Sequence, residues 1–302
     1  MASNFSKAAQ DEIWQSPDTI FCSANPDPKN QLDVTDDGIV CSGIWYYGSN
    51  CENSQWMMLS QHMPLEDGSI DRVSTLIPTS AARIDHDSWQ TSGLQGTGSK
   101  TIYLDKPVFV PRHMMTSFHG GKFGAPGRDI EGNIMSRFPF PTFGTSMLAA
   151  PILGMAQGAL DIFINHSKKK IRMIKPGMTE PVSNSPIIQS KIGIASASID
   201  AALALLISSS DAAEQVLRRG EELSVGEKIT LRRNQGFAAR QAVSVVNDLF
   251  AMEGSSASSL AAPMQRFWRD VNTGAQHITL NWDSISTMYG QQVFGLTPIG
   301  NY

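Results

Sequence analysis

The stretch SFHGGKFGAPGRDIEGNIMSRFPFPTF, residues 117–143, separates two parts of the chain whose hydrophobic residues follow different periodicities. It is rich in Gly, Pro and Phe, and 27 residues without a periodic pattern are long for a connection inside a compact domain. The stretch is therefore either a plain linker or a functional loop. Four of its phenylalanines, at 118, 123, 138 and 140, favour a loop that packs over a ligand, although aromatic residues also anchor structural loops.

Upstream of this stretch, residues 17–116 are predicted to form an antiparallel β-domain, a small barrel or sandwich. Short runs of alternating or β-branched residues are separated by turn sequences such as Asp36-Asp37-Gly38 and Glu66-Asp67-Gly68. The predicted strands are Gly38–Trp45, Trp56–Ser60, Ile70–Ile77, Lys100–Leu104 and Val108–Val110.

Downstream of it, residues 144–302 are predicted to form an antiparallel four-helix bundle, which makes the chain an α+β protein. Apolar residues recur there at helical spacing, and Gly, Pro and Ser clusters separate the helical stretches. The predicted helices are Thr145–Ser167, Pro186–Ser209, Val225–Glu253 and Pro263–Gly290.

Composition narrows the class of protein. The chain has 24 Lys plus Arg and 28 Asp plus Glu, a net charge of −4, which argues against nucleic acid as a main partner. Cys22, Cys41 and Cys51 lack the CxxC spacing of a zinc site and, being odd in number, do not indicate a disulfide framework. The longest purely apolar stretch, Ala201–Ile207, is too short to span a membrane. We expect a soluble cytoplasmic protein without a membrane partner or metal site.

Two stretches of the β-domain are candidate ligand-binding segments. Trp89–Ser99 reads WQTSGLQGTGS, in which glycines permit close approach of a planar ligand or phosphate and hydroxyls offer hydrogen bonds. It matches neither nucleotide-binding fingerprint, and an ordinary glycine-rich turn fits the same spacing. Gly43–Cys51 contains three consecutive aromatic residues, which suit either a stacking wall for an aromatic ring or the core of the barrel.

The helical part contains two further candidates. Asp270 and His277 lie seven residues apart and would share a face of a continuous helix, so an Asp-oriented histidine base is possible there. The basic run Lys168–Arg172 suits a solvated helix end or a phosphate clamp. The chain contains neither GxSxG nor the kinase motifs, which excludes the corresponding hydrolases and phosphotransferases.

Taken in order, these segments resemble the acyl-CoA dehydrogenase fold, and specifically its flavin-dependent monooxygenase branch, which includes hydroxyphenylacetate and secosteroid hydroxylases. The resemblance extends from about Ala8 to Pro298. Gly43–Ser49 resembles a G-x-W-x-F-x-S-G strand of the family. Trp89–Ser99 with Val108–Pro111 resembles its W-x-x-x-G-x-x-G-T-G-S…V-F-V-P signature, and Gln265–Asp270 resembles its Q-R-x-x-R-D segment.

The resemblance implies a homotetramer whose subunits contain an N-terminal helical domain, a central β-domain and a C-terminal four-helix bundle. Here the first of these is almost wholly absent, so we expect residues 1–16 to be its remnant and the chain to be a short or truncated form.

The residues near His277 favour the monooxygenase branch. An acyl-CoA dehydrogenase of this fold uses a glutamate base shortly after the R-x-R-D segment, and the corresponding Thr273–Ile278 contains no Glu. In the monooxygenase branch a histidine there helps to deprotonate or orient a phenol, a task that suits neutral imidazole. Three alternatives stay open: a dehydrogenase, a desulfurising, N-hydroxylating or indole-oxidising member, and a non-catalytic scaffold of the fold.

The resemblance also implies the cofactor and its partners. FADH2 or FMNH2, supplied by a separate NAD(P)H-dependent flavin reductase, would bind between β-domain and bundle and react with O2 to form a C4a-hydroperoxide that hydroxylates a small aromatic substrate. His277 and Ser49 are the expected catalytic residues, with His119 the next candidate base, and Asn50 replaces the glycine that usually follows Ser49. The expected cofactor-binding residues are Trp45, Tyr47, Ser49, Trp89, Thr91, Ser99, Lys170, Arg172 and Arg266.

Overall fold

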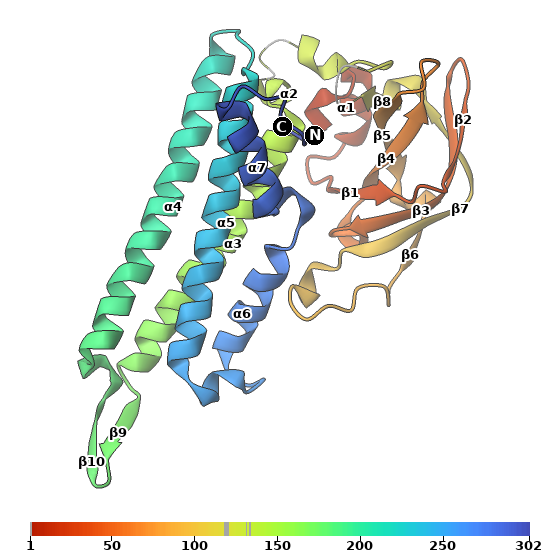
Figure 1. Cartoon of the computed structure of the whole chain (residues 1–302). Helices are drawn as coiled ribbons and strands as arrows, with labels where there is room; N and C mark the ends of the chain where they lie inside the picture. Colours follow the sequence, from red (N-terminus) through yellow and green to blue (C-terminus); the bar gives the residue numbers. More distant parts are fainter. Residues whose placement is uncertain (1, 118–120, 131, 133) are drawn as a thin grey trace. The chain divides into compact units, whose positions relative to one another are not determined.

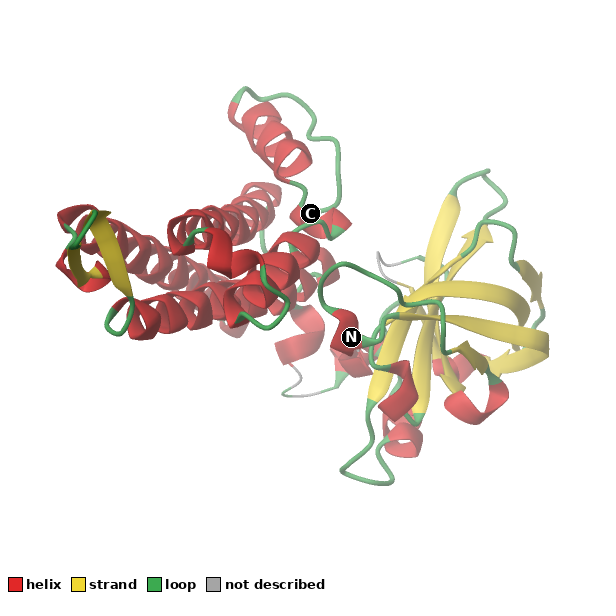
Figure 2. Cartoon of the chain, turned by 90° about the horizontal axis from the view of Figure 1, so that it is seen from below, coloured by secondary structure: helices red, strands yellow, loops and turns green. Residues whose placement is uncertain are grey.

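The computed structural model describes residues 2–117, 121–130, 132 and 134–302 (Figure 1). The chain divides into two compact units. The β unit comprises Met1–Thr91 and Gln95–Phe138, and the bundle unit comprises Ser92–Leu94 and Pro139–Tyr302. Figure 2 shows the strands gathered in one unit and the long helices in the other. The α+β class predicted from the hydrophobic periodicities is confirmed.

The β unit is built on one eight-stranded sheet with the order β6-β7-β3-β1-β4-β5-β8, in which β2 also pairs with β3. All pairs are antiparallel except β1 with β4, whose parallel register sets Phe21 opposite Trp56. This departs from the predicted antiparallel domain, and it is possible because the connection through β2 and β3 is long enough for a crossover. The strands are β1 (Phe21–Pro26), β2 (Gln31–Val34), β3 (Gly38–Gly48), β4 (Trp56–Pro64), β5 (Ile70–Pro78), β6 (Arg83–Asp85), β7 (Lys100–Pro111) and β8 (Met115–Ser117).

The N-terminal residues belong to the core of the β unit. Helix α1 (Lys7–Ile13) begins at Ser6, whose hydroxyl caps it by accepting a hydrogen bond from the backbone N–H of Ala9. Phe5, Ala9 and Ile13 are fully buried among the apolar side chains of the strands. Each large side chain buried in this way stabilises the fold by about 1.5–3 kcal/mol. This N-terminal segment therefore packs as part of the β unit, and its origin as the remnant of a separate domain stays a prediction.

The bundle unit is organised around α5, which packs against α3, α4, α6 and α7. Alanines at 156, 159, 238, 239 and 242 are buried where these helices meet, and small side chains let helix axes approach closely. Ser224 and Glu227 form a capping box that sets the start of α5. The helices are α3 (Phe140–Ser167), α4 (Pro186–Arg218), α5 (Val225–Glu253), α6 (Pro263–Gly274) and α7 (Trp282–Val293).

The fourth predicted helix is interrupted, which corrects the continuous span expected over Pro263–Gly290. Helix α6 ends at Gly274, a 3₁₀ turn covers Ile278–Leu280, and α7 begins at Trp282. Two side chains stabilise the break: the imidazole of His277 accepts a hydrogen bond from the backbone N–H of Thr279, and the side chain of Asn281 accepts one from Ser284. Local capping therefore overrides the continuous apolar periodicity.

The stretch 117–143 also differs from the single loop that was expected. It contains a 3₁₀ turn (Pro126–Asp129), α2 (Ile134–Arg137) and the first residues of α3. Phe123 packs against the core of the β unit, whereas Phe118 and the alternative base His119 lie outside the described residues.

The basic run after α3 forms part of a hairpin rather than only a helix end. Helix α3 ends at Ser167, and β9 (Ile171–Lys175) pairs with β10 (Met178–Pro181). By length and composition alone, Gly144–Ser167 and Pro186–Arg218 could each cross a membrane. Both helices bury residues in the bundle core, and core helices of water-soluble proteins satisfy the same two criteria.

Candidate functional site

The sheet brings Ser49 and Ser99, fifty residues apart in sequence, to within hydrogen-bonding distance. Strands β3 and β7 pair up to Gly48 and Lys100, so the two residues that follow and precede this pair meet at the end of the ladder. The hydroxyl oxygens of Ser49 and Ser99 are 2.7 Å apart. Asn50 adopts a left-handed conformation with φ of 63°, which asparagine tolerates better than most residues and which replaces the usual glycine without loss of the turn.

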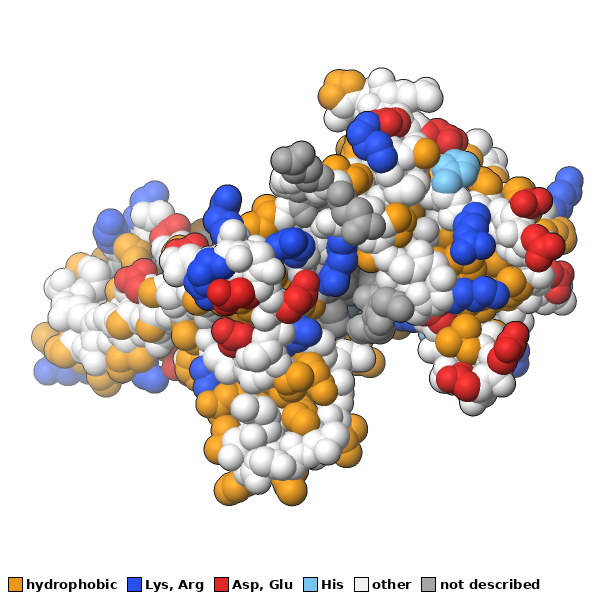
Figure 3. All heavy atoms as spheres, turned by 90° about the horizontal axis from the view of Figure 1, so that it is seen from above, with side chains coloured by type: hydrophobic (Ala, Val, Ile, Leu, Met, Phe, Trp, Pro, Cys, Tyr) orange, Lys and Arg blue, Asp and Glu red, His pale blue; other side chains and the backbone are white. Residues whose placement is uncertain are grey.

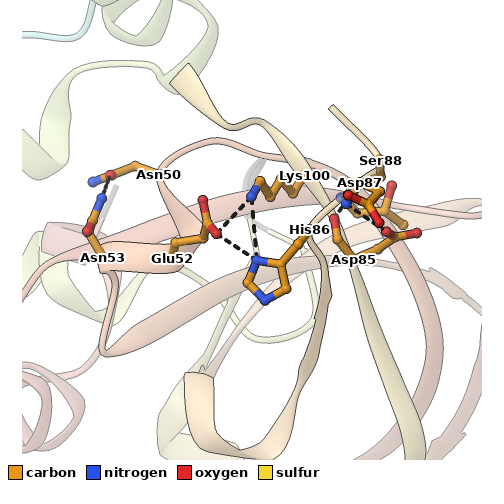
Figure 4. A network of polar contacts seen from close by, with 9 residues as sticks. Asn50, Glu52, Asn53, Asp85, His86, Asp87, Ser88 and Lys100 are labelled. Atoms are coloured by element: carbon orange, nitrogen blue, oxygen red, sulfur yellow. Dashed lines mark hydrogen bonds and ion pairs between the residues drawn. The ribbon is translucent and has the colours of Figure 1, made fainter. Parts of the chain in front are cut away.

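An exposed ion-pair network lies next to this hydroxyl pair (Figure 4). The carboxylate of Glu52 lies 2.7 Å from Lys100 Nζ and 2.7 Å from His86 Nδ1. The hydrogen bond from Lys100, and then that from His86, hold the pKa of Glu52 below its usual 4.5. Because Lys100 directly follows Ser99, the network braces the start of β7 beside the turn. The sequence offered no signal for it, since its members come from three separate segments.

The turn combines hydroxyl groups with exposed surface. Of the two paired hydroxyls only one can donate to the other, which leaves one O–H free to bind a ligand. The side chain of Tyr47 is 65% exposed beside them, and a Cβ added to Gly96 would meet no atom within 4 Å. The half-buried Trp89 and Thr91 belong to the same loop, and the Gln95 side chain donates to the Thr91 carbonyl. These residues fit a planar, hydrogen-bonding cofactor.

Trp45 corrects the predicted cofactor set. Its side chain is 0% exposed, and its indole N–H donates to the Ser60 carbonyl oxygen at 2.8 Å inside the β unit. Trp45 is therefore a core residue. Alternation along a strand explains the difference, because neighbouring side chains of β3 point to opposite faces.

In the bundle unit, helix α6 binds the short segment Ser92–Leu94. Asp270 accepts a hydrogen bond from the Leu94 backbone N–H at 2.6 Å, and Arg269 donates to the Ser92 carbonyl. A Cβ on Gly93 would lie 2.3 Å from the Arg269 carbonyl oxygen, so only glycine fits there. Asp270 therefore holds this segment. The shared helix face that would make a pairing of Asp270 with His277 possible is absent, because α6 ends before His277.

His277 is positioned by its own turn. Its Nδ1 lies 2.8 Å from the Thr279 hydroxyl oxygen and accepts a hydrogen bond from the Thr279 backbone N–H at 3.2 Å. The residue is exposed, yet desolvation by the surrounding protein, and then the positive charge of Arg232, lower its pKa below the usual 6.5. Near neutral pH the imidazole is uncharged.

The three cations among the predicted cofactor-binding residues lie in separate segments of the chain. Lys170 donates to the Glu253 carbonyl oxygen at 2.6 Å and its Nζ is 3.8 Å from the Glu253 carboxylate. Arg172 on β9 binds Glu180 on β10. Arg266 is exposed on α6. In the part of the chain that the structure describes, there is no cluster of His, Cys, Asp and Glu that could hold a metal ion.

Similarity to known proteins extends over nearly the whole chain. The family described as acyl-CoA dehydrogenase, C-terminal domain, matches residues 146–282. The oxygenase subunit HsaA of a flavin-dependent monooxygenase from Rhodococcus jostii is 33% identical, over 97% of this chain and 76% of its own length. The oxygenase component of a FADH(2)-dependent resorcinol hydroxylase from a Rhizobium species is 34% identical, over 99% of this chain and 74% of its own length.

The fold is also similar to that of a solved structure that contains FADH2. XiaF from a Streptomyces species, in complex with FADH2 and glycerol, has a TM-score of 0.85 and 27% identity over 99% of this chain and 75% of its own. Sequence relatives and fold therefore agree on the same class of protein.

Proposed function

The chain belongs to the flavin-dependent monooxygenases with the acyl-CoA dehydrogenase fold, and on that premise we propose how its residues divide the work of oxidation. It is the oxygenase component of a two-component aromatic hydroxylase that uses reduced flavin and O2. Such components receive reduced flavin from a separate reductase. The finer assignments that follow are the proposal: which residues hold the cofactor, which residue acts on the substrate, and how the chains assemble.

The Ser49–Ser99 hydroxyl pair carries the proposal for the cofactor. When bound, reduced flavin supplies the activation of O2 and the oxygen atom that is transferred. The free O–H of the pair donates to the polar edge of the isoalloxazine ring, and the exposed Tyr47 ring offers an apolar surface beside it. Because strand pairing sets the distance between the hydroxyls before any ligand arrives, little conformational freedom is lost on binding. FADH2 is the proposed form, as named for the resorcinol hydroxylase and XiaF.

His277 carries the proposal for the substrate. It is an uncharged imidazole on a turn that follows α6, at the point where a dehydrogenase of this fold would need a carboxylate. A neutral imidazole can hydrogen-bond the oxygen of an electron-rich aromatic molecule without placing a second charge near it. The proposed substrate class is therefore a small phenolic, indolic or polycyclic compound.

Helix α4 carries the proposal for assembly. Four large apolar residues on it, Ile187, Ile194, Leu203 and Ile207, are exposed, and hydrophobic side chains are visible on the surface in Figure 3. Ile187 and Ile194 lie on one side of α4, and Leu203 and Ile207 lie on the opposite side. The 33-residue helix therefore exposes apolar residues on both sides of its buried stripe, which is typical of an interface. We propose a homotetramer that works in the cytoplasm. A single-chain mass by light scattering at micromolar concentration would contradict the oligomer.

One experiment tests the function as a whole. Purified protein is supplied with NADH, FAD, O2 and a panel of phenols and indoles, with and without a separate flavin reductase. Hydroxylated product is expected only when the reductase is present, because the sequence contains no nicotinamide-binding fingerprint. Equal turnover without the reductase would contradict the proposed electron source. Flavin reduction by an acyl-CoA thioester would instead identify a dehydrogenase, and absence of saturable binding of anaerobically reduced FAD would identify a scaffold.

A further inference from the structure

Arg232 is a buried charge that the proposed function does not yet use. It lies on α5 with only 4% of its surface exposed. Its guanidinium donates to the Thr279 carbonyl oxygen at 2.7 Å and to the Thr145 hydroxyl on α3. Burial lowers its pKa to about 10, so it still carries a positive charge at neutral pH. A buried charge is costly unless it is hydrogen-bonded, which makes the two acceptors essential to its placement.

Thr279 connects this charge to His277. Its carbonyl oxygen accepts from Arg232, while its backbone N–H donates to His277 Nδ1 at 3.2 Å. A backbone N–H can only donate, so Nδ1 must present its lone pair to it. In a neutral imidazole the single proton is then on Nε2. The Thr279 hydroxyl oxygen lies 2.8 Å from the same nitrogen, on the same side of the ring.

We infer that Arg232 and Thr279 are positioning residues that hold His277 as the neutral, Nε2-protonated tautomer, which makes His277 a hydrogen-bond donor to the substrate oxygen rather than the base that removes its proton. The inference rests on the proposed function of His277. An Nε2 that already carries a proton cannot accept another, and the lone pair of Nδ1 is occupied by Thr279. The site would therefore favour a substrate that arrives as its oxyanion.

The charges around the turn support the same form. From α5, the positive charge of Arg232 disfavours an imidazolium at His277. From α3, the neutral hydroxyl of Thr145 contacts Arg232. From α6, Asp270 and Arg269 are directed to the Ser92–Leu94 segment. Arg232 is thus the charge that acts on the imidazole among the described residues.

A tautomer measurement tests the inference independently of catalysis. Long-range ¹H–¹⁵N spectra of the histidine ring distinguish a protonated from an unprotonated nitrogen. For His277, identified by its loss in His277→Gln, the proton is expected on Nε2 at pH 7.5. A proton on Nδ1 would overturn the inference, whether or not the protein hydroxylates any substrate.

Two substitutions of His277 test its role in the reaction. His277→Gln places an amide N–H near the position of Nε2, and this amide cannot accept a proton. His277→Asn places its amide near the position of Nδ1, so it has no donor at the position of Nε2. With the reductase and the best phenol, His277→Gln is expected to stay within about 10-fold of the wild-type rate and His277→Asn to fall by about 10²-fold. Equal losses of about 10²-fold in both variants would identify a base and overturn the inference.

Paired substitutions of Arg232 test its positioning role. Arg232→Met removes the charge that disfavours imidazolium, so the pKa of His277 should rise and the ratio of product to O2 consumed should begin to fall at higher pH than in the wild type. Arg232→Lys keeps the charge and should keep the wild-type profile. The control Thr279→Val keeps the backbone N–H and should keep the tautomer. Identical pH profiles for the Met and Lys variants would show that Arg232 only packs.

Discussion

The Ser49–Ser99 turn and the His277 turn are held in place by different forces. The first lies at the end of a ladder of backbone hydrogen bonds between β3 and β7, so its position is insensitive to most single side chains. The second lies where a helix breaks, and its position depends on the side chains of His277, Thr279 and Arg232. A site held by the backbone tolerates substitution of its ligands, whereas a site held by side chains changes when one of them is lost.

The largest expected effect is on stability, and it compares two glycines of one loop, one in each unit. Gly93→Ala, in the bundle unit, would force a Cβ against the Arg269 carbonyl oxygen and should destabilise the protein by about 1–3 kcal/mol, with weaker flavin binding. The matched control Gly96→Ala, in the β unit, meets open space and should stay within about 0.5 kcal/mol of the wild type. Denaturant titration and flavin titration measure both quantities, and equal effects of the two substitutions would contradict this view of the loop.

A smaller effect is expected for the hydroxyl pair itself. Ser49→Ala or Ser99→Ala removes about one net hydrogen bond, worth about 0.5–1.5 kcal/mol, so the Kd for reduced FAD should rise about 3–10-fold without loss of fold. The double variant should cost less than the sum, because the two hydroxyls act as one unit. Ser69→Ala, an exposed serine in the turn between β4 and β5, is the control. Unchanged affinity in both single variants would remove the pair from the cofactor site.

The smallest expected effect is on the pH dependence of stability. The pKa of His277 is lowered in the native state, so the unfolded chain binds more protons as pH falls through 6.5, and acid destabilises the native state from that point. Glu52 also has a lowered pKa, and its contribution should be lost only as pH falls below its usual 4.5. Melting curves should therefore show that His277→Gln reduces the decline in Tm between pH 7.5 and 5.5. Glu52→Gln should leave that decline unchanged and alter Tm only near pH 4. The same decline in all three proteins would contradict the assignment.

Part of the candidate site could be predicted because its residues lie in recognisable motifs. Ser49, Trp89, Thr91 and Ser99 were predicted from the resemblance of their segments to motifs of the family, and the sheet brings Ser49 and Ser99 to hydrogen-bonding distance. Their role in binding the cofactor stays a prediction. Trp45 was misassigned because the local sequence around a ligand-binding tryptophan does not differ from that around a core tryptophan. Its burial depends on which face of β3 meets the rest of the sheet.

Other residues could not be predicted because long-range contacts create their roles. Glu52, His86 and Lys100 meet only through the pairing of strands, and Arg232 resembles any other arginine of a long amphipathic helix until α3 and the Thr279 turn enclose it. Whether Asp270 and His277 share a helix face could not be decided from sequence for a similar reason. Helical spacing assumed a continuous helix, but capping by His277 and Asn281 ends it.

The sequence by itself determined the order of the β and helical parts, the family and the reduced-flavin chemistry, because hydrophobic periodicity and short motifs are local properties of a chain. Only the tertiary structure decided which groups contact one another. These contacts are the hydroxyl pair of Ser49 and Ser99, the hydrogen bonds of α6 to Ser92–Leu94, and the hydrogen bond of the buried Arg232 to the turn that holds His277. The physical reason is that hydrogen bonds and charges act over a few ångströms. Such distances between residues far apart in sequence exist only once strands have paired and helices have packed.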